Sequence, residues 1–184
     1  MNAVAASLRD RGFLIVHAPS ETMAFYERSK ARQKALAAPR IAPPVTQMPD
    51  PPQLPIAISE SEGCDTIGDT PHAPWRRQHP AIEIDEKRDV VSDSGEELYS
   101  VYRARDITDV LILGVHTNMC VLNRPFAIKA MVGWGLRPIL VRDLTDAMYD
   151  PADPPYVNHD DGTQLVIEYV EKFWCPSATS QALL

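Results

Sequence analysis

Cys120 is the residue of this sequence whose position best fits nucleophilic chemistry. The apolar run VLILGV, residues 110–115, predicts a buried strand, and the turn at 116–119 then places Cys120 at or near the start of a helix. Free N–H groups and the dipole at a helix start stabilise a thiolate and can bind an oxyanion on an attacked carbonyl. The alternative is a buried small hydrophobe, the commonest role of a free cysteine. Position alone leaves both interpretations open.

Polar side chains also follow the next predicted strand, at 138–141. Tyr149 and His159 lie in the loop after it, together with Tyr156 and Asn158. Because such a loop rims the carboxyl end of a sheet, substrate contacts from Tyr149 and His159 are predicted. The preferred alternative is that Asn158 to Asp161 cap the last helix, since acidic groups are favoured at a helix N-terminus.

Arg124, four residues after the candidate nucleophile, is a further candidate substrate-binding residue because it could bind a carboxylate. Pro125 removes a helical hydrogen bond and is expected to bend the helix there. His72 and His79 lie in a proline-rich stretch without metal-ligand spacing, so both are expected at the surface. The sequence predicts neither a metal site nor a cofactor.

Short apolar runs alternate with helical patterns along the chain, which predicts an α/β fold with a doubly wound parallel sheet. One domain over 1–176 is expected, with a proline-rich insertion at 39–80 and a frayed tail at 177–184. The predicted strands are 13–16, 81–84, 110–115 and 138–141, and the predicted helices are 2–11, 20–38, 94–105, 120–133 and 163–174.

Composition excludes several function classes. The 184 residues contain 18 Lys and Arg against 25 Asp and Glu, so no basic surface is expected to bind nucleic acid or an anionic membrane. The longest apolar run is too short to span a bilayer, and the first residues do not resemble a signal peptide. Three widely spaced cysteines make no disulfide framework, so a reducing, cytoplasmic location is expected.

The segment GVHTNMCV, residues 114–121, resembles the G-V-x-T-x-x-C-V signature of the isochorismatase-like cysteine hydrolases, which include nicotinamidase and N-carbamoylsarcosine and ureidoacrylate amidohydrolases. The order of the elements over 1–175 is similar too, including HAPS at 17–20 and GLRPILVRDLTDAM at 135–148. The resemblance implies a Rossmann-like fold and hydrolysis of a C–N bond in a small amide, imide or ureido compound. Cys120 would form a thioester, and a homo-oligomer is expected.

The resemblance also implies partners for Cys120. Lys87 fits the family lysine, which favours the thiolate and holds the tetrahedral intermediate by charge; a solvated lysine in the charged run 85–89 is the alternative. The chain departs from the family's Ser-Ala-Phe at 91–93. The N–H groups of His116 and Cys120 would form the oxyanion hole, with a cis peptide bond between Val115 and His116.

The family's general-base Asp has no counterpart. It ends a first strand with a motif like D-M-Q-x-D-F, and no such motif precedes Asn2. We therefore expect the first central strand to be missing, which would leave 13–16 and 110–115 without a shared partner. The alternative function is a non-catalytic family member that binds a metabolite or assembles with another subunit. In an active chain, Asp146 or His159 is the first candidate for the acid–base role.

Overall fold

The structure is a computed structural model, and it describes residues 1–49, 51–57 and 75–184. These residues form two compact units: 1–44, 75–108 and 180–184 make up the first, and 45–49, 51–57 and 109–179 the second. Each unit contains a parallel sheet with helices packed against it, so the predicted α/β class is confirmed. The predicted sheet is divided into one of two strands and one of three. Within the described ranges, no helix is long and apolar enough to cross a membrane.

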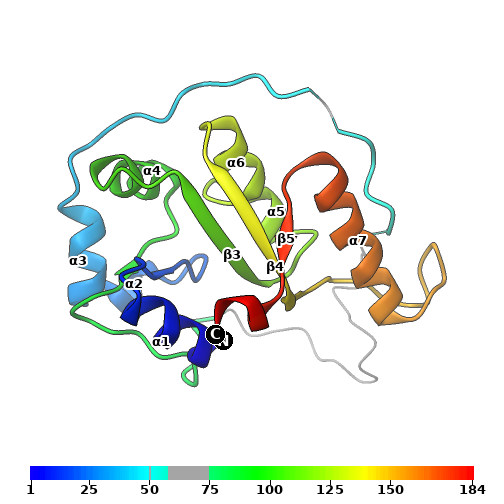
Figure 1. Cartoon of the computed structure of the whole chain (residues 1–184), viewed down its shortest axis with the longest axis horizontal. Helices are drawn as coiled ribbons and strands as arrows, with labels where there is room; N and C mark the ends of the chain where they lie inside the picture. Colours follow the sequence, from blue (N-terminus) through cyan, green and yellow to red (C-terminus); the bar gives the residue numbers. More distant parts are fainter. Residues whose placement is uncertain (50, 58–74) are drawn as a thin grey trace. The chain divides into compact units, whose positions relative to one another are not determined.

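The first unit begins with helix α1, Asn2–Asp10 (Figure 1). Val4 and Leu8, one turn apart, are its buried apolar residues. The helix ends before Gly12, whose φ of 85° is the left-handed conformation that glycine adopts without a Cβ penalty. This end was predicted correctly.

Strands β1 (Val16–His17) and β2 (Val90–Val91) form the parallel sheet of the first unit, with Val16 opposite Val90. The strand predicted at 13–16 begins only at Val16. Phe13 lies outside it, because its side chain is half exposed beneath the guanidinium of Arg11. The strand predicted at 81–84 is wrong. Val90 and Val91 are fully buried and take its place, whereas the residues at 81–84 lie in a turn and irregular segment.

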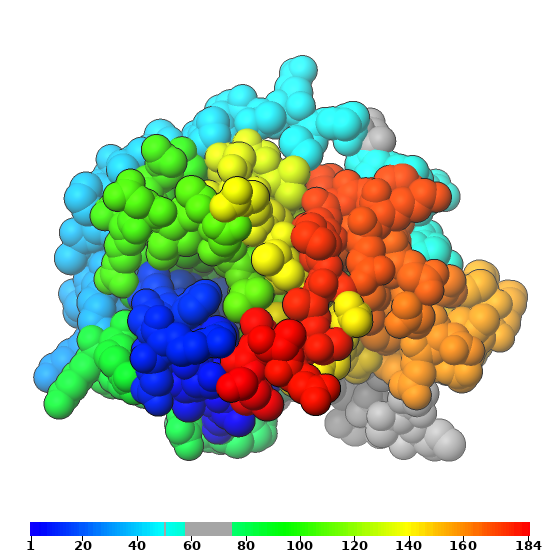
Figure 2. All heavy atoms as spheres, in the orientation of Figure 1, coloured from blue at the N-terminus to red at the C-terminus, as the bar shows by residue number. Residues whose placement is uncertain are grey.

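The helix predicted at 20–38 is two helices, α2 (Met23–Tyr26) and α3 (Lys30–Leu36). Ser29 interrupts it, because its extended backbone and its hydroxyl, which accepts from the N–H of Arg32, form an N-cap. Helix α4, Gly95–Ala104, matches its prediction and has Ser94 as N-cap. The 3₁₀ helix η1, Ser180–Leu183, lies against α1 (Figure 2). The Ser7 hydroxyl donates to the carbonyl of Leu183 at 3.1 Å.

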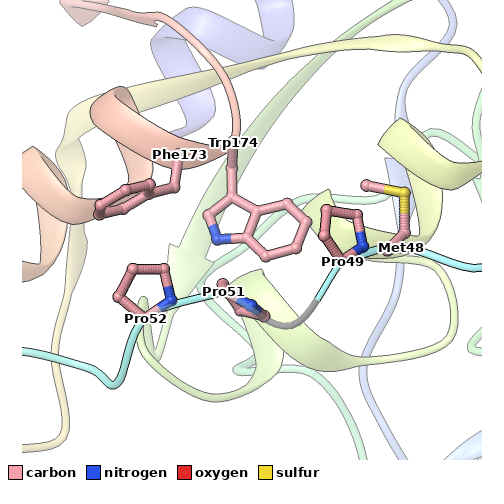
Figure 3. A pocket seen from close by; sticks show the side chains of 6 residues that line it. All are labelled: Met48, Pro49, Pro51, Pro52, Phe173 and Trp174. Carbon is pink, nitrogen blue, oxygen red and sulfur yellow. The ribbon is translucent and has the colours of Figure 1, made fainter.

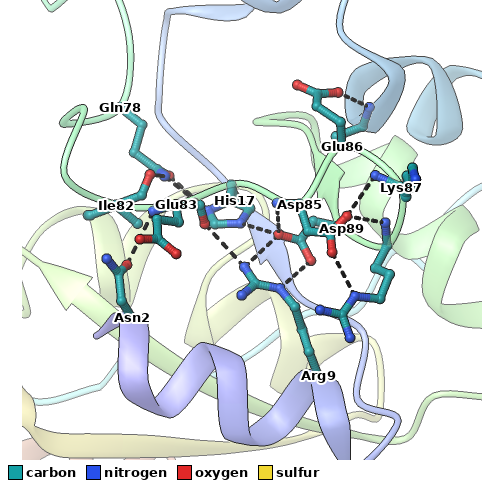
Figure 4. Close-up of polar contacts among 12 residues, drawn as sticks. Asn2, Arg9, His17, Gln78, Ile82, Glu83, Asp85, Glu86, Lys87 and Asp89 are labelled. Atoms are coloured by element: carbon teal, nitrogen blue, oxygen red, sulfur yellow. Dashed lines mark hydrogen bonds and ion pairs between the residues drawn. The ribbon is translucent and has the colours of Figure 1, made fainter.

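A buried ionic cluster joins α1 and β1 to Asp89, the residue before β2 (Figure 4). Arg9 donates two hydrogen bonds of 2.7 Å to the carboxylate of Asp89, which is fully buried. His17 Nε2 lies 3.0 Å from the same carboxylate, and the N–H of Asp85 donates to it at 2.8 Å. Burial opposes ionisation of Asp89, but these donors outweigh it and hold its pKa below the usual value.

The sheet of the second unit has the strand order β3 (Asp109–Val115), β4 (Arg137–Asp146), β5 (Ser177–Ala178), and all three strands are parallel (Figure 1). The tail predicted to fray is therefore ordered: β5 pairs with Leu140 and Val141, and η1 follows it. Since β3 is an edge strand of this sheet, its apolar residues stay partly exposed.

Helices α5 (Cys120–Asn123), α6 (Ile128–Gly133) and α7 (His159–Phe173) share one apolar core with β4. Leu122, Ile128, Leu140 and Val170 are the fully buried residues at its centre. Because α5 and α7 pack into the same core, both cover the same face of the sheet. The helix predicted to start at 163 begins four residues earlier, at His159.

The described part of the proline-rich stretch contains no helix or strand. In the second unit it lies along the end of α7, where Pro49, Pro51 and Pro52 surround the indole of Trp174 (Figure 3). The hydroxyl of Tyr169 donates to the carbonyl of Pro52 at 2.8 Å. These contacts explain how a segment without regular structure is held on the second unit.

Candidate active site

Cys120 lies in an open pocket of about 260 Å³ in the second unit. It is the first residue of α5, directly after the turn that leaves β3, and its side chain is partly exposed. The pocket is lined by Asn118, Met119, Cys120, Asn123 and Arg124. The predicted position after a strand and at a helix start is confirmed, but β3 is partly exposed and not the buried strand that was predicted.

The turn before Cys120 is held by hydrogen bonds to the end of β4. The N–H of Thr117 donates to the carbonyl of Asp146 at 2.7 Å. The Asn118 side chain donates to the carbonyl of Met148 and accepts from its N–H, both at 2.9 Å. Thr117 and Asn118 are fully buried, so the turn has little freedom to move the thiol.

The resemblance predicted a cis peptide bond between Val115 and His116, and this bond is cis in the structure. The carbonyl of His116 accepts from the N–H groups of Met119 and Val121, both at 3.1 Å. The oxyanion role of the His116 and Cys120 N–H groups stays a prediction.

The nucleophile helix is shorter than predicted. α5 ends after one turn at Asn123, and Arg124 is extended because the proline that follows excludes a helical conformation at that position. The predicted bend at Pro125 is therefore confirmed as a complete break, and the single helix expected over 120–133 is wrong. A helix of one turn has only a small dipole to act on the thiol.

Arg124 lines the pocket, and its role in substrate binding stays a prediction. A second cation, Lys129, donates from Nζ to the side-chain oxygen of Asn123 at 2.6 Å, and Asn123 donates to the carbonyl of Asn118 at 2.9 Å. Burial lowers the pKa of Lys129. The hydrogen bonds of Asn118, Asn123 and Lys129 were not predicted from the sequence, because each depends on a partner that the fold brings close.

His159 and Asp146 form a hydrogen-bonded pair at the same end of the sheet. His159 Nε2 lies 2.9 Å from Asp146 Oδ1, and its Nδ1 lies 3.0 Å from the carbonyl oxygen of Tyr149. The Thr163 hydroxyl also donates to Asp146 Oδ1, at 3.0 Å. The His159 side chain is 15% exposed and that of Asp146 is 50% exposed, so the carboxylate reaches solvent.

Tyr149 is fully buried in the core. Its hydroxyl donates to the carbonyl of Asp153 at 3.0 Å and accepts from the N–H of Val157 at 3.1 Å, which shapes the loop. Tyr156 is exposed. The capping alternative for the end of this loop is confirmed, because Asn158 accepts from the N–H of Asp161 at 2.9 Å.

Lys87 lies in the first unit, where its side chain is exposed in a turn and its N–H donates to Asp85 at 2.8 Å (Figure 4). Its catalytic role stays a prediction. His79 is exposed, as expected, whereas Cys64 and His72 lie outside the described residues. Cys175 is buried, and burial raises the pKa of its thiol to about 11. In the described part of the chain, no group of three or more His, Cys, Asp or Glu residues could hold a metal ion.

Comparison with known proteins gives one structural similarity. No family model matches the sequence, and no curated protein matches it. A solved structure of a cysteine hydrolase from Pseudomonas syringae pv. phaseolicola 1448A is similar to this chain, with 23% sequence identity and a TM-score of 0.45. The similarity covers 58% of this chain and 55% of that one; the chain therefore spans about half the length of the protein it matches.

Proposed function

We propose that this chain is an isochorismatase-like cysteine hydrolase that acts on a C–N bond of a small amide, imide or ureido compound. The observation that carries the proposal is the position of Cys120, partly exposed in a pocket and fixed by a buried turn. Arg124 lines the same pocket and supplies a charged group at its wall, which suits a small polar substrate.

The proposed reaction has two covalent steps. Cys120 Sγ attacks the carbonyl carbon, the C–N bond breaks, and the amine leaves with the thiol proton, so that a thioester remains. Water then hydrolyses the thioester and releases the acid and the thiol. N–H groups of His116 and Cys120 would hold the developing oxyanion.

Mass spectrometry of the hydrolysis products tests the proposal. The chain is incubated with a panel of small primary amides, cyclic imides and ureido acids, and the Cys120→Ala variant serves as the control. We expect hydrolysis of at least one class and a loss of at least about 10³-fold in the variant, since the nucleophile is essential. If both proteins bind a panel compound equally and leave it unchanged, the non-catalytic alternative is correct.

A further inference from the structure

We propose that the carboxylate of Asp146, oriented by His159, is the proton acceptor for the water that hydrolyses the Cys120 thioester. The proposal rests on the proposed function. It assigns a base to the hydrolytic half of the reaction from residues of the second unit, which also contains Cys120.

The backbone places Asp146 beside the nucleophile turn. β3 and β4 are parallel neighbours, and Val115 lies opposite Asp146 in their register. The hydrogen bond from Thr117 to the carbonyl of Asp146 ties the turn to the same residue. The carboxyl ends of parallel strands meet at one edge of a sheet, so Asp146 and Cys120 share that edge.

The helices bring the two residues to the same face. Cys120 begins α5 and His159 begins α7, and both helices pack into one core with β4. His159 lies 2.9 Å from Asp146, so the Asp146 side chain is directed to the face that α5 and α7 cover.

The carboxylate is fixed through one oxygen. Asp146 Oδ1 accepts a hydrogen bond from the Thr163 hydroxyl and also lies 2.9 Å from His159 Nε2. The Thr163 hydroxyl in turn accepts from the N–H of Ala147 at 3.1 Å. The Nδ1 of His159 lies 3.0 Å from the carbonyl oxygen of Tyr149, and this second contact fixes the orientation of the ring beside Asp146. Thr163 and His159 both contact Oδ1, and half of the Asp146 side chain is exposed. Among the described residues Asp146 Oδ2 accepts no hydrogen bond, so this oxygen is available to a water molecule.

The step balances as follows. The water oxygen bonds to the thioester carbonyl carbon while one water proton passes to Asp146 Oδ2. The C–S bond breaks, its electron pair goes to Cys120 Sγ, and the acid product leaves. The proton on Asp146 then passes to the thiolate, which restores the thiol and the carboxylate. His159 touches no reacting atom in this scheme and is a positioning residue.

The activated ester 4-nitrophenyl acetate separates the two half-reactions. Acetylation of Cys120 gives a burst of nitrophenol, and thioester hydrolysis sets the steady-state rate. We expect Asp146→Asn to keep the burst and to lose about 10²-fold or more in the steady state, the contribution typical of a general base. Intact-mass spectra should show the acetyl group accumulating on Cys120. The matched control is Asp160→Asn, which removes a charge from the first turn of α7 and should behave as the wild-type chain.

A second pair of measurements distinguishes a base from a structural residue. Added formate should partly restore the steady-state rate of Asp146→Ala, because a small carboxylate can replace the missing base. His159→Gln, which keeps Asp146, should slow the steady state at least about 10-fold with the burst intact. Formate without effect, or an unchanged steady-state rate in Asp146→Asn, overturns the proposal. A wild-type chain that shows no Cys120-dependent burst overturns the proposed function itself, and the assignment of Asp146 with it.

Discussion

Gly162 packs its backbone against the ring of Tyr149, so that a Cβ atom at position 162 would lie 2.2 Å from Tyr149 Cδ1 and 2.6 Å from Cε1. Tyr149 is fully buried and its hydroxyl is fixed by the backbone of 153 and 157. The ring therefore has no room to retreat. This contact sets how closely the first turn of α7, which carries His159, approaches the loop after β4.

Gly162→Ala should destabilise the protein even though alanine favours a helix. Alanine in a helix interior gains about 1 kcal/mol over glycine, but overpacking a filled core costs about 1–3 kcal/mol, and here the clash is with a rigid ring. We expect the free energy of unfolding in urea to fall by about 1–2 kcal/mol. Gly133→Ala is the control, because its nearest atoms would be 3.9 and 4.0 Å away. Equal stability of both variants would contradict the contact.

Asp89→Asn should be among the most destabilising polar substitutions in the first unit. It leaves the guanidinium of Arg9, whose side chain is 6% exposed, without its carboxylate, and breaking a buried pair in this way costs about 3–5 kcal/mol. Chemical denaturation measures the loss. Asp10→Asn removes an exposed carboxylate 3.2 Å from Arg88 and should cost no more than about 1 kcal/mol. A loss at Asp89 as small as this would show that the cluster does not stabilise the unit.

The same carboxylate makes stability depend on acid pH. The pKa of Asp89 is lowered in the folded chain, so its contribution is complete above the unfolded value of about 3.9 and is lost as the pH falls through the folded value. The difference in unfolding free energy between the wild type and Asp89→Asn should therefore shrink as the pH falls from about 5 to about 2. Urea titrations over this range measure it. A difference that stays constant would mean that Asp89 is not the group responsible.

Cys120 should react with iodoacetamide before Cys175. Cys120 is partly exposed in its pocket, whereas Cys175 is buried and its pKa of about 11 leaves little thiolate near neutral pH. Substoichiometric labelling followed by peptide mass spectrometry locates the adduct, and Cys175→Ala should give the same rate of labelling at Cys120. Preferential labelling of Cys175 would contradict the assignment of Cys120 as the nucleophile.

Local sequence signals predicted the features that depend on near neighbours. Gly12 ends α1 in a left-handed conformation and Ser94 caps α4, because a cap needs only one residue type at one position. The apolar run at 110–115 and the turn after it placed Cys120 at a helix start. Pro125 interrupts the helix that follows, since its ring excludes a regular hydrogen bond. Each of these features rests on covalent chemistry or on contacts within about one turn.

Tertiary packing decided the rest. Val90 and Val91 became the strand in place of 81–84 because burial, and not the local apolar pattern, selects which segment pairs with β1. The segment predicted to fray forms β5 because β4 offers it a parallel partner. The contact between His159 and Asp146 joins residues 13 apart, and the cluster around Asp89 joins α1 to residues about 80 positions away. No sequence pattern encodes these distances, because strand pairing and helix packing in three dimensions bring the groups together.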